Sequence, residues 1–160
     1  MPHEIQPHAL AKDEGRAVWF LGTLAIVKAT AESTRGAFGL IDSVIPAGFE
    51  SPYHVHHAED ESFYVTEGEV TFICDGRKLK VGPGAYVFGP REIPHGFRIE
   101  GTAPARMLFL TTPAGFERFI LEMSEPATDL ALPQPTPPDM EKLTALAAKY
   151  KIDILGPLPS

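Results

Sequence analysis

The chain has 160 residues, enough for one domain with a sizeable hydrophobic core and an additional segment. Hydrophobic residues make up 44% of the sequence, as expected for a folded protein, and the 14 Gly and 16 Pro favour an all-β domain with many turns. The net charge of -7 disfavours nucleic acid and anionic membranes as partners, because both attract basic surfaces.

Cysteine content and the start of the chain indicate the compartment. Cys74 is the one cysteine, so an internal disulfide is excluded. The polar start, MPHEIQPHALAKDEG, lacks the charged and then apolar pattern of a secretory signal. No apolar run approaches the roughly 20 residues that span a bilayer. We therefore expect a cytoplasmic protein without membrane contact.

The first part of the chain predicts an arm followed by strands. Residues 1–16 are polar and are expected to form an N-terminal arm. The stretch AVWFLGTLAIVKAT then predicts two short strands that break at Gly22, and residues 38–45 predict a third. We assign Trp19 to the core or to an interface rather than to cofactor stacking.

The stretch 48–68, GFESPYHVHHAEDESFYVTEG, carries the clearest chemistry. His54 and His56 are two residues apart, which on a strand points both imidazoles to the same face. Residues 57–60 are polar and short enough for a turn, so Glu61 at the start of the next strand can meet both histidines.

A second stretch, residues 84–95, delivers a fourth ligand, His95, after two prolines. Three imidazoles and one carboxylate suit one divalent transition ion, namely Fe, Mn, Ni, Co, Cu or Zn. Four protein ligands leave a position open on a five- or six-coordinate ion, which is typical of a reactive metal site. Isolated histidines are usually surface or core residues, but this spacing with a carboxylate favours the metal interpretation.

Three neighbouring side chains are considered as alternative metal ligands. Strand alternation turns His57 away from the other histidines, so it is expected to face solvent or support a loop. Glu59 is the substitute ligand if Glu61 is not one. Cys74 is interpreted as a small buried apolar residue rather than a thiolate ligand.

Further short strands follow the metal-binding stretch. Asp75-Gly76 is a two-residue hairpin signal, because both positions can take positive φ. The chain as a whole predicts about ten strands at intervals of roughly ten residues, which indicates a sandwich or barrel. The strands expected after Glu61 are residues 62–65, 69–74, 77–81, 85–88 and 106–111.

The pattern changes to helix after the last of these strands. An apolar stripe at i, i+3, i+4 and i+7 predicts a helix within residues 113–130, and we expect it to pack on the barrel wall rather than to act as a substrate lid. The stripe consists of Phe116, Phe119, Ile120 and Met123. Residues 131–138 contain four prolines and predict a stiff linker. Asp139 is a good N-cap for a helix over about residues 140–150, and the tail adds a strand or covers a partner subunit.

The spacing of the motif residues resembles the cupin superfamily. The pattern of the first cupin motif is fitted by Gly48, His54, His56, Glu61 and Gly68, and that of the second by Gly84, Pro90 and His95. Glu92 stands where Gly is usual and Ile99 where Asn is usual, and both departures concern loop shape rather than the metal. The resemblance implies an all-β fold, a cupin double-stranded β-helix or jelly-roll barrel, over residues 17–112. The segments 113–130 and 131–160 would then be a helix on the barrel and a Pro-rich linker with a short helix and tail.

Within the superfamily the chain is similar to the single-domain quercetin dioxygenase-like proteins. The similarity rests on PYHVHHAEDESFYVTEGEVTF, GFERFILEMSEPA and PDMEKLTALAAKYKIDILGP. It implies a metal-dependent dioxygenase that acts with O2 on a flavonol or a similar metal-chelating hydroxy-aromatic compound, and it implies a homodimer. His54, His56 and His95 would hold the metal, and Glu61 would be both ligand and catalytic base. Burial in an apolar barrel gives Glu61 a reason for a raised pKa.

Two other functions use the same residues. One is a non-catalytic cupin that binds a small molecule through its metal, and the other is a metal-dependent isomerase that needs no O2. For the substrate pocket, five aromatic side chains are expected to point into the barrel, where packing alone would also require them. They are Tyr53, Phe63, Phe72, Phe97 and Phe109.

Overall fold

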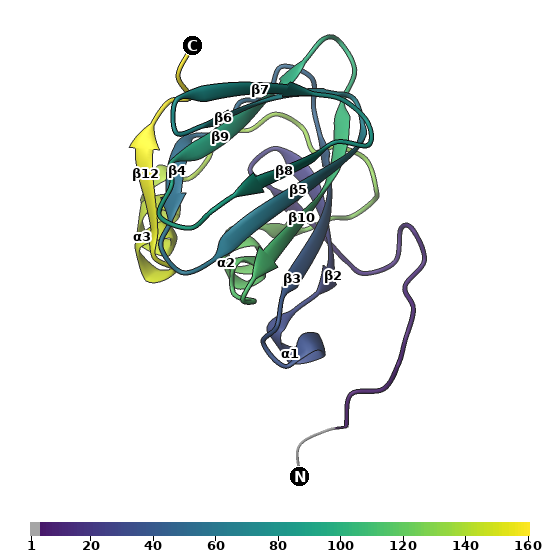
Figure 1. Ribbon diagram of the computed structural model, residues 1–160. Helices are drawn as coiled ribbons and strands as arrows, with labels where there is room; N and C mark the ends of the chain where they lie inside the picture. The colour runs from purple at the N-terminus through teal and green to yellow at the C-terminus, as the bar shows by residue number, and fades with distance from the viewer. Residues whose placement is uncertain (1–3) are drawn as a thin grey trace.

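Two antiparallel β-sheets face each other in the computed structural model, which describes residues 4–160 (Figure 1). The first three residues of the predicted arm lie outside this range. One sheet has the strand order β11-β1-β2-β3-β10-β5-β8, and the other has the order β12-β4-β9-β6-β7. This arrangement confirms the predicted all-β jelly-roll barrel.

The elements lie close to the predicted ranges. The strands of the larger sheet are β1 (Arg16–Phe20), β2 (Thr23–Ala29), β3 (Gly39–Ile45), β5 (Asp60–Glu67), β8 (Tyr86–Gly89), β10 (Ala105–Thr112) and β11 (Glu125–Pro126). The strands of the smaller sheet are β4 (Tyr53–His56), β6 (Glu69–Cys74), β7 (Arg77–Val81), β9 (His95–Glu100) and β12 (Ile152–Gly156). The helices are α1 (Ala31–Thr34), α2 (Phe116–Met123) and α3 (Met140–Lys149).

The core lies between the sheets, where alternate residues of each strand point inward. In the larger sheet β10 pairs with both β3 and β5, so Phe109 lies between Ile41 and Phe63. Phe63 contacts Phe109 edge-to-face at a centroid distance of 5.2 Å and Phe72 of the other sheet at 4.8 Å. These aromatic contacts join the two sheets at the centre of the barrel.

Two turns depend on their glycines. The β6–β7 hairpin turns at Asp75 and Gly76, with φ values of 50° and 76°, as the sequence predicted for this dipeptide. Gly68 has a φ of 87°, and a Cβ at this position would lie 2.7 Å from Cα of Ala105. The close approach as well as the dihedral angle therefore requires glycine between β5 and β6.

The C-terminal segment completes both sheets, although we expected the barrel to end at residue 112. β11 pairs with β1, and β12 pairs with β4, so the tail adds a strand to the barrel (Figure 1). Ile152 is the register partner of His56 and Ile154 that of His54. The end of the chain therefore lies directly beside the two histidines of the first motif.

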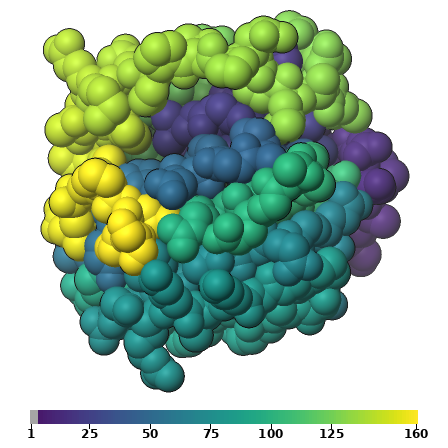
Figure 2. Space-filling view, turned by 90° about the horizontal axis from the view of Figure 1, so that it is seen from above, coloured from purple at the N-terminus to yellow at the C-terminus, as the bar shows by residue number. Residues whose placement is uncertain are grey.

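The helices and their connection cover one side of the barrel. α3 begins after Asp139, whose side chain accepts a hydrogen bond from the Lys142 amide at 3.0 Å, as expected for the predicted N-cap. The yellow-green segment between α2 and α3 runs past the dark purple N-terminal strands in Figure 2, and Trp19 Nε1 donates a hydrogen bond to the Ala131 carbonyl there. α1, which was not predicted, is a single turn with a Thr30–Ser33 capping box. No helix within residues 4–160 is long and apolar enough to cross a membrane.

Candidate metal centre and cavity

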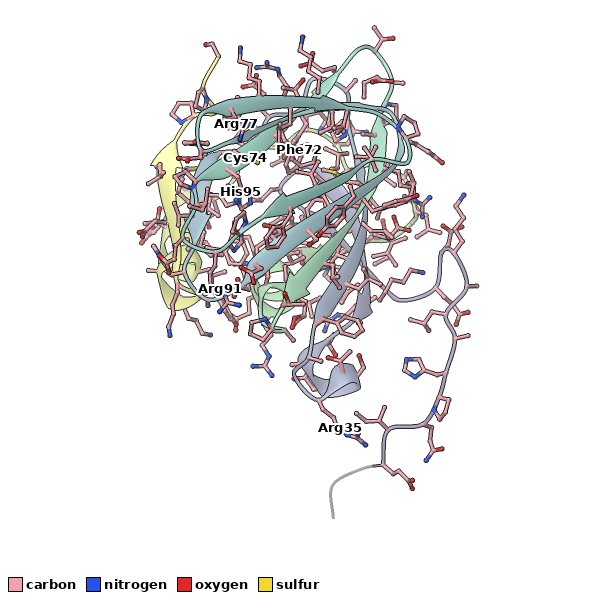
Figure 3. All side chains as sticks on the ribbon, viewed as in Figure 1. Arg35, Phe72, Cys74, Arg77, Arg91 and His95 are labelled. Carbon is pink, nitrogen blue, oxygen red and sulfur yellow. The ribbon has the colours of Figure 1, made fainter. Side chains whose placement is uncertain are left out.

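The fold brings together the four side chains that the sequence assigned to a metal. His54 and His56 come from β4, Glu61 from β5 and His95 from β9, and His54 is the register partner of His95. One nitrogen or oxygen atom from each side chain lies within 4.8 Å of the corresponding atoms of the others. His95 is only 1% exposed and lies in the barrel interior (Figure 3).

Each imidazole is oriented by an oxygen atom near its Nδ1. Nδ1 of His54 donates to the Pro52 carbonyl at 2.7 Å, and Nδ1 of His95 lies 3.4 Å from the Ile93 carbonyl. In His56 the partner is the Glu59 carboxylate, at 3.2 Å. Such contacts leave Nε2 as the coordinating atom, because a carbonyl oxygen can only accept a hydrogen bond.

The donor atoms fit a cation. Glu61 Oε2 lies 2.9 Å from Nε2 of His56 and 3.1 Å from Nε2 of His95. Despite the short distance, Nε2 of His56 is buried without a well-oriented hydrogen bond to any residue in the described part of the chain. A buried polar atom without a partner is costly, and a cation beside Glu61 would satisfy it. The mixed nitrogen and oxygen set suits a divalent transition ion.

The pKa values of these groups reflect their mutual contacts. Burial, with the nearby His95 and His56, lowers the pKa of His54 to about 3. Burial also opposes the charged form of His56, but the Glu61 and Glu59 carboxylates outweigh it and raise the pKa to about 9.

The prediction of a raised pKa for Glu61 is wrong for the four side chains as they stand. Burial does raise the pKa of this carboxyl, as expected, but His56 and His95 lie close enough to outweigh burial and lower it. Glu61 is therefore held in its ionised form, which is the form that binds a cation.

The three alternative ligands named from the sequence lie outside the group of four converging side chains. His57 is partly exposed and lies between Glu92, at 2.7 Å, and Asp153, at 2.8 Å, so it supports loops as expected. Glu59 lies behind His56 rather than among the four converging atoms. Cys74 is half-buried beside His95 in the β6–β9 register, and burial raises the pKa of its thiol.

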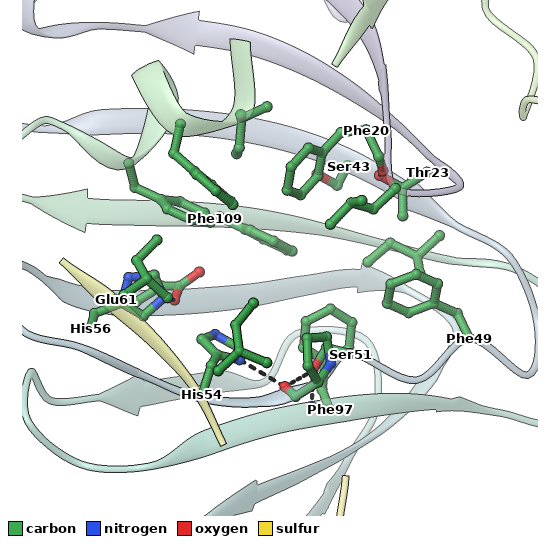
Figure 4. A pocket seen from close by; sticks show the side chains of 18 of the residues that line it. Phe20, Thr23, Ser43, Phe49, Ser51, His54, His56, Glu61, Phe97 and Phe109 are labelled. Atoms are coloured by element: carbon green, nitrogen blue, oxygen red, sulfur yellow. Dashed lines mark hydrogen bonds and ion pairs between the residues drawn. The ribbon is translucent and has the colours of Figure 1, made fainter. Parts of the chain in front are cut away.

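An apolar cavity of about 90 Å³, lined at one end by His54, His56 and Glu61, extends into the barrel (Figure 4). Of the five aromatic residues expected in the substrate pocket, Phe63, Phe97 and Phe109 line it. Tyr53 instead accepts a hydrogen bond from the Gly76 amide, and Phe72 is fully buried against Phe63.

Several residues that line the cavity were not expected there, because they lie outside the predicted barrel. They are Phe116, Phe119 and Ile120 of α2, Leu143 of α3, and Ile152 and Ile154 of β12. α2 therefore closes the cavity as well as packing on the barrel. The apolar stripe of this helix was visible in the sequence, but the stripe does not reveal which surface it covers.

Two known proteins are similar to parts of the chain. The chain is 27% identical to quercetin 2,3-dioxygenase of Bacillus subtilis over 126 residues, which are 79% of this chain and 37% of that protein. It is 40% identical to a dimethylsulfoniopropionate lyase of Ruegeria pomeroyi over 55 residues, 34% of this chain and 27% of the lyase. The chain thus matches well under half the length of either relative.

A solved structure and a family comparison define the fold. The crystal structure of a predicted oxalate decarboxylase from Thermotoga maritima superposes with a TM-score of 0.62 at 16% identity, covering 66% of this chain and 99% of that chain. At this identity the likeness concerns the fold alone. Residues 42–111, which include all four candidate ligands, match the family described as Cupin domain. Over these residues the chain therefore resembles the cupin family.

Proposed function

We propose that the protein is a metal-dependent dioxygenase resembling quercetin 2,3-dioxygenase, which acts with O2 on a flavonol or a similar metal-chelating hydroxy-aromatic compound. The observation that carries this proposal is the buried cluster of three histidines and one glutamate at the end of a cavity lined by phenylalanines. The similarity to the Bacillus enzyme over most of the chain supports it.

In this proposal His54, His56, His95 and Glu61 hold one divalent ion. When bound, the ion would supply Lewis-acid and one-electron chemistry. Glu61, one of the four converging groups, would also accept the proton of the substrate hydroxyl. Phe63, Phe97 and Phe109 flank the aromatic ring and exclude water from it.

The test is oxygen consumption by protein reconstituted with Fe, Mn, Ni or Co in turn, with quercetin and simpler aromatic diols as substrates. We expect oxygen uptake with at least one metal, and we expect the Glu61→Gln variant to lose it while keeping part of its metal. Tight metal binding without oxygen uptake on any of these compounds would contradict the proposal.

A second candidate is a redox-neutral reaction at the same site, either an elimination or an isomerisation. The match to the dimethylsulfoniopropionate lyase is the observation that favours it. Glu61 would again move a proton, but no O2 would be used. Conversion of a substrate under nitrogen at an undiminished rate would select this reaction over the dioxygenase.

A further inference from the structure

Ser43 presents a hydroxyl group to the cavity that the proposed chemistry does not use. Its side chain is 3% exposed and lines the cavity from β3. The two other cavity hydroxyls have protein partners, since Thr23 donates to the Phe20 carbonyl and Ser51 to the Pro52 carbonyl. The Ser43 hydroxyl makes no hydrogen bond with any residue in the range 4–160. A buried hydroxyl of this kind is available to a ligand.

Ser43 lies at the end of the cavity away from the metal centre. The strand register aligns Glu61 with Thr111 and Thr111 with Gly39, and Ser43 is four residues further along β3. At the rise of a β-strand this places Ser43 roughly 13 Å beyond the level of Glu61. In Figure 4 Ser43 lies beside Phe20 and Thr23, on the opposite side of the view from His56 and Glu61.

The distance between the two ends sets the length of a ligand that touches both. With the offset of roughly 13 Å along the strands as the scale, a metal–oxygen bond of about 2 Å and a hydrogen bond to Ser43 of about 2.8 Å leave roughly 8 Å for the ligand. This is about the length of one six-membered ring with a substituent of two atoms. A ligand of this length has its chelating oxygens on one side of the ring and the substituent on the other.

The volume of the cavity sets an upper limit on the size of the ligand. The cavity measures about 90 Å³. For comparison, an apolar cavity of about 150 Å³ accommodates benzene, whereas pockets for drug-sized ligands measure about 300–1,000 Å³. The cavity is smaller than the one that accommodates benzene, so it holds at most one ring and excludes the three rings of a flavonol.

The charge of the lining restricts the substituent. Apart from His54, His56 and Glu61, all the lining residues are uncharged. A carboxylate or ammonium group beside Ser43 would be buried without a counter-charge, which is costly. A neutral hydroxyl or amide would form a hydrogen bond with Ser43 at no such cost.

From these observations we infer that the site selects a neutral, single-ring compound with two vicinal oxygens at the metal and a hydrogen-bonding substituent at Ser43. This inference rests on the proposed function for the chelating end of the compound. Within the metal-chelating hydroxy-aromatic compounds proposed above, it selects monocyclic diols and excludes flavonols. Ser43 determines the specificity for the substituent through a hydrogen bond to it.

The test is binding rather than turnover. Isothermal titration calorimetry with Zn²⁺-loaded protein measures affinity without oxidation, because Zn²⁺ has no redox chemistry. The probes are 4-(hydroxymethyl)catechol, 4-methylcatechol, 3,4-dihydroxybenzoate and quercetin. We expect the hydroxymethyl compound to bind most tightly. Ser43→Ala should weaken its binding about 3- to 10-fold, the effect of losing one hydrogen bond, and should leave 4-methylcatechol within about twofold.

Ser62→Ala is the matched control, because this serine lies on β5 outside the cavity and its hydroxyl contacts Tyr86. Quercetin binding as tight as that of the catechols would overturn the inference on size. An unchanged preference for the hydroxymethyl compound in Ser43→Ala would overturn the role of Ser43. Since the assay uses no oxygen, these results are independent of whether the dioxygenase proposal holds.

Discussion

Glu59 Oε1 lies 3.2 Å from Nδ1 of His56, while Nε2 of the same ring lies 2.9 Å from Glu61. Glu59 is 4% exposed, so its carboxylate is buried behind the ring. A carboxylate in this position fixes the orientation of a coordinating imidazole and makes its other nitrogen a more basic metal ligand. Glu59, which the sequence offered as a substitute for Glu61, therefore contacts His56 instead, and we propose that it positions this ring.

Glu59→Ala should weaken metal binding about 10- to 100-fold, because His56 would lose the group that orients its ring. Competition with a chelator that reports free Zn²⁺ measures this affinity directly. Glu141→Gln, at an exposed position of α3, is the control and should not change it. Equal affinity in Glu59→Ala and the wild type would remove Glu59 from the metal centre.

Replacing any one of His54, His56 and His95 by Ala should abolish or greatly weaken metal binding and leave the barrel folded. The contacts between Phe63, Phe72 and Phe109 hold the two sheets together without the ion, so the core supplies most of the stability. Metal content after dialysis and the far-UV circular dichroism spectrum measure the two effects. A metal-free wild type that is unfolded would contradict this prediction.

The sequence predicted that the candidate metal ligands converge, because residues close together in the chain carry most of this information. His54, His56 and Glu61 lie within eight residues, and strand alternation with one turn is enough to bring them together. The pairing of Ile152 with His56 was not predictable, because no local pattern selects the strand beside which the tail lies. The pKa direction of Glu61 also depends on distances: burial was correctly expected, but the closeness of His56 reverses its effect.

Glu92 occupies the position where the second cupin motif usually has glycine, and its backbone is strained there. Glu92 has a φ of 71°, in the left-handed region where glycine is favoured, and its carboxylate contacts His57. Glu92→Gly and Glu92→Ala both lose this exposed contact, which contributes little to stability. Only the Gly variant relieves the backbone strain. We expect it to be about 1 kcal/mol more stable than the Ala variant in urea unfolding, and equal stability would show that the backbone is unstrained.

Glu117 is a fully buried carboxyl in the first turn of α2. Oε2 accepts a hydrogen bond from the Gly115 amide at 3.0 Å, while Oε1 has no partner among residues 4–160. Burial raises the pKa of this group. Between the unfolded and folded pKa values the folded protein therefore binds more protons than the unfolded chain. The contribution of Glu117 to stability falls as the pH rises from about 4.5 through the folded pKa.

Glu117→Gln removes this dependence, so the variant should gain stability relative to the wild type as the pH rises from 4.5 to 8. Each unit of pKa shift corresponds to about 1.4 kcal/mol, which urea unfolding at a series of pH values resolves. Glu122→Gln is the matched control on the same helix. Lys149 lowers the pKa of Glu122, so the stabilisation from this exposed pair is present at neutral pH and lost on acidification. The stability of the Glu122 variant relative to the wild type should therefore stay constant from pH 4.5 to 8, since its change falls below pH 4.5. The absence of a gain in Glu117→Gln over the same range would contradict the raised pKa of Glu117.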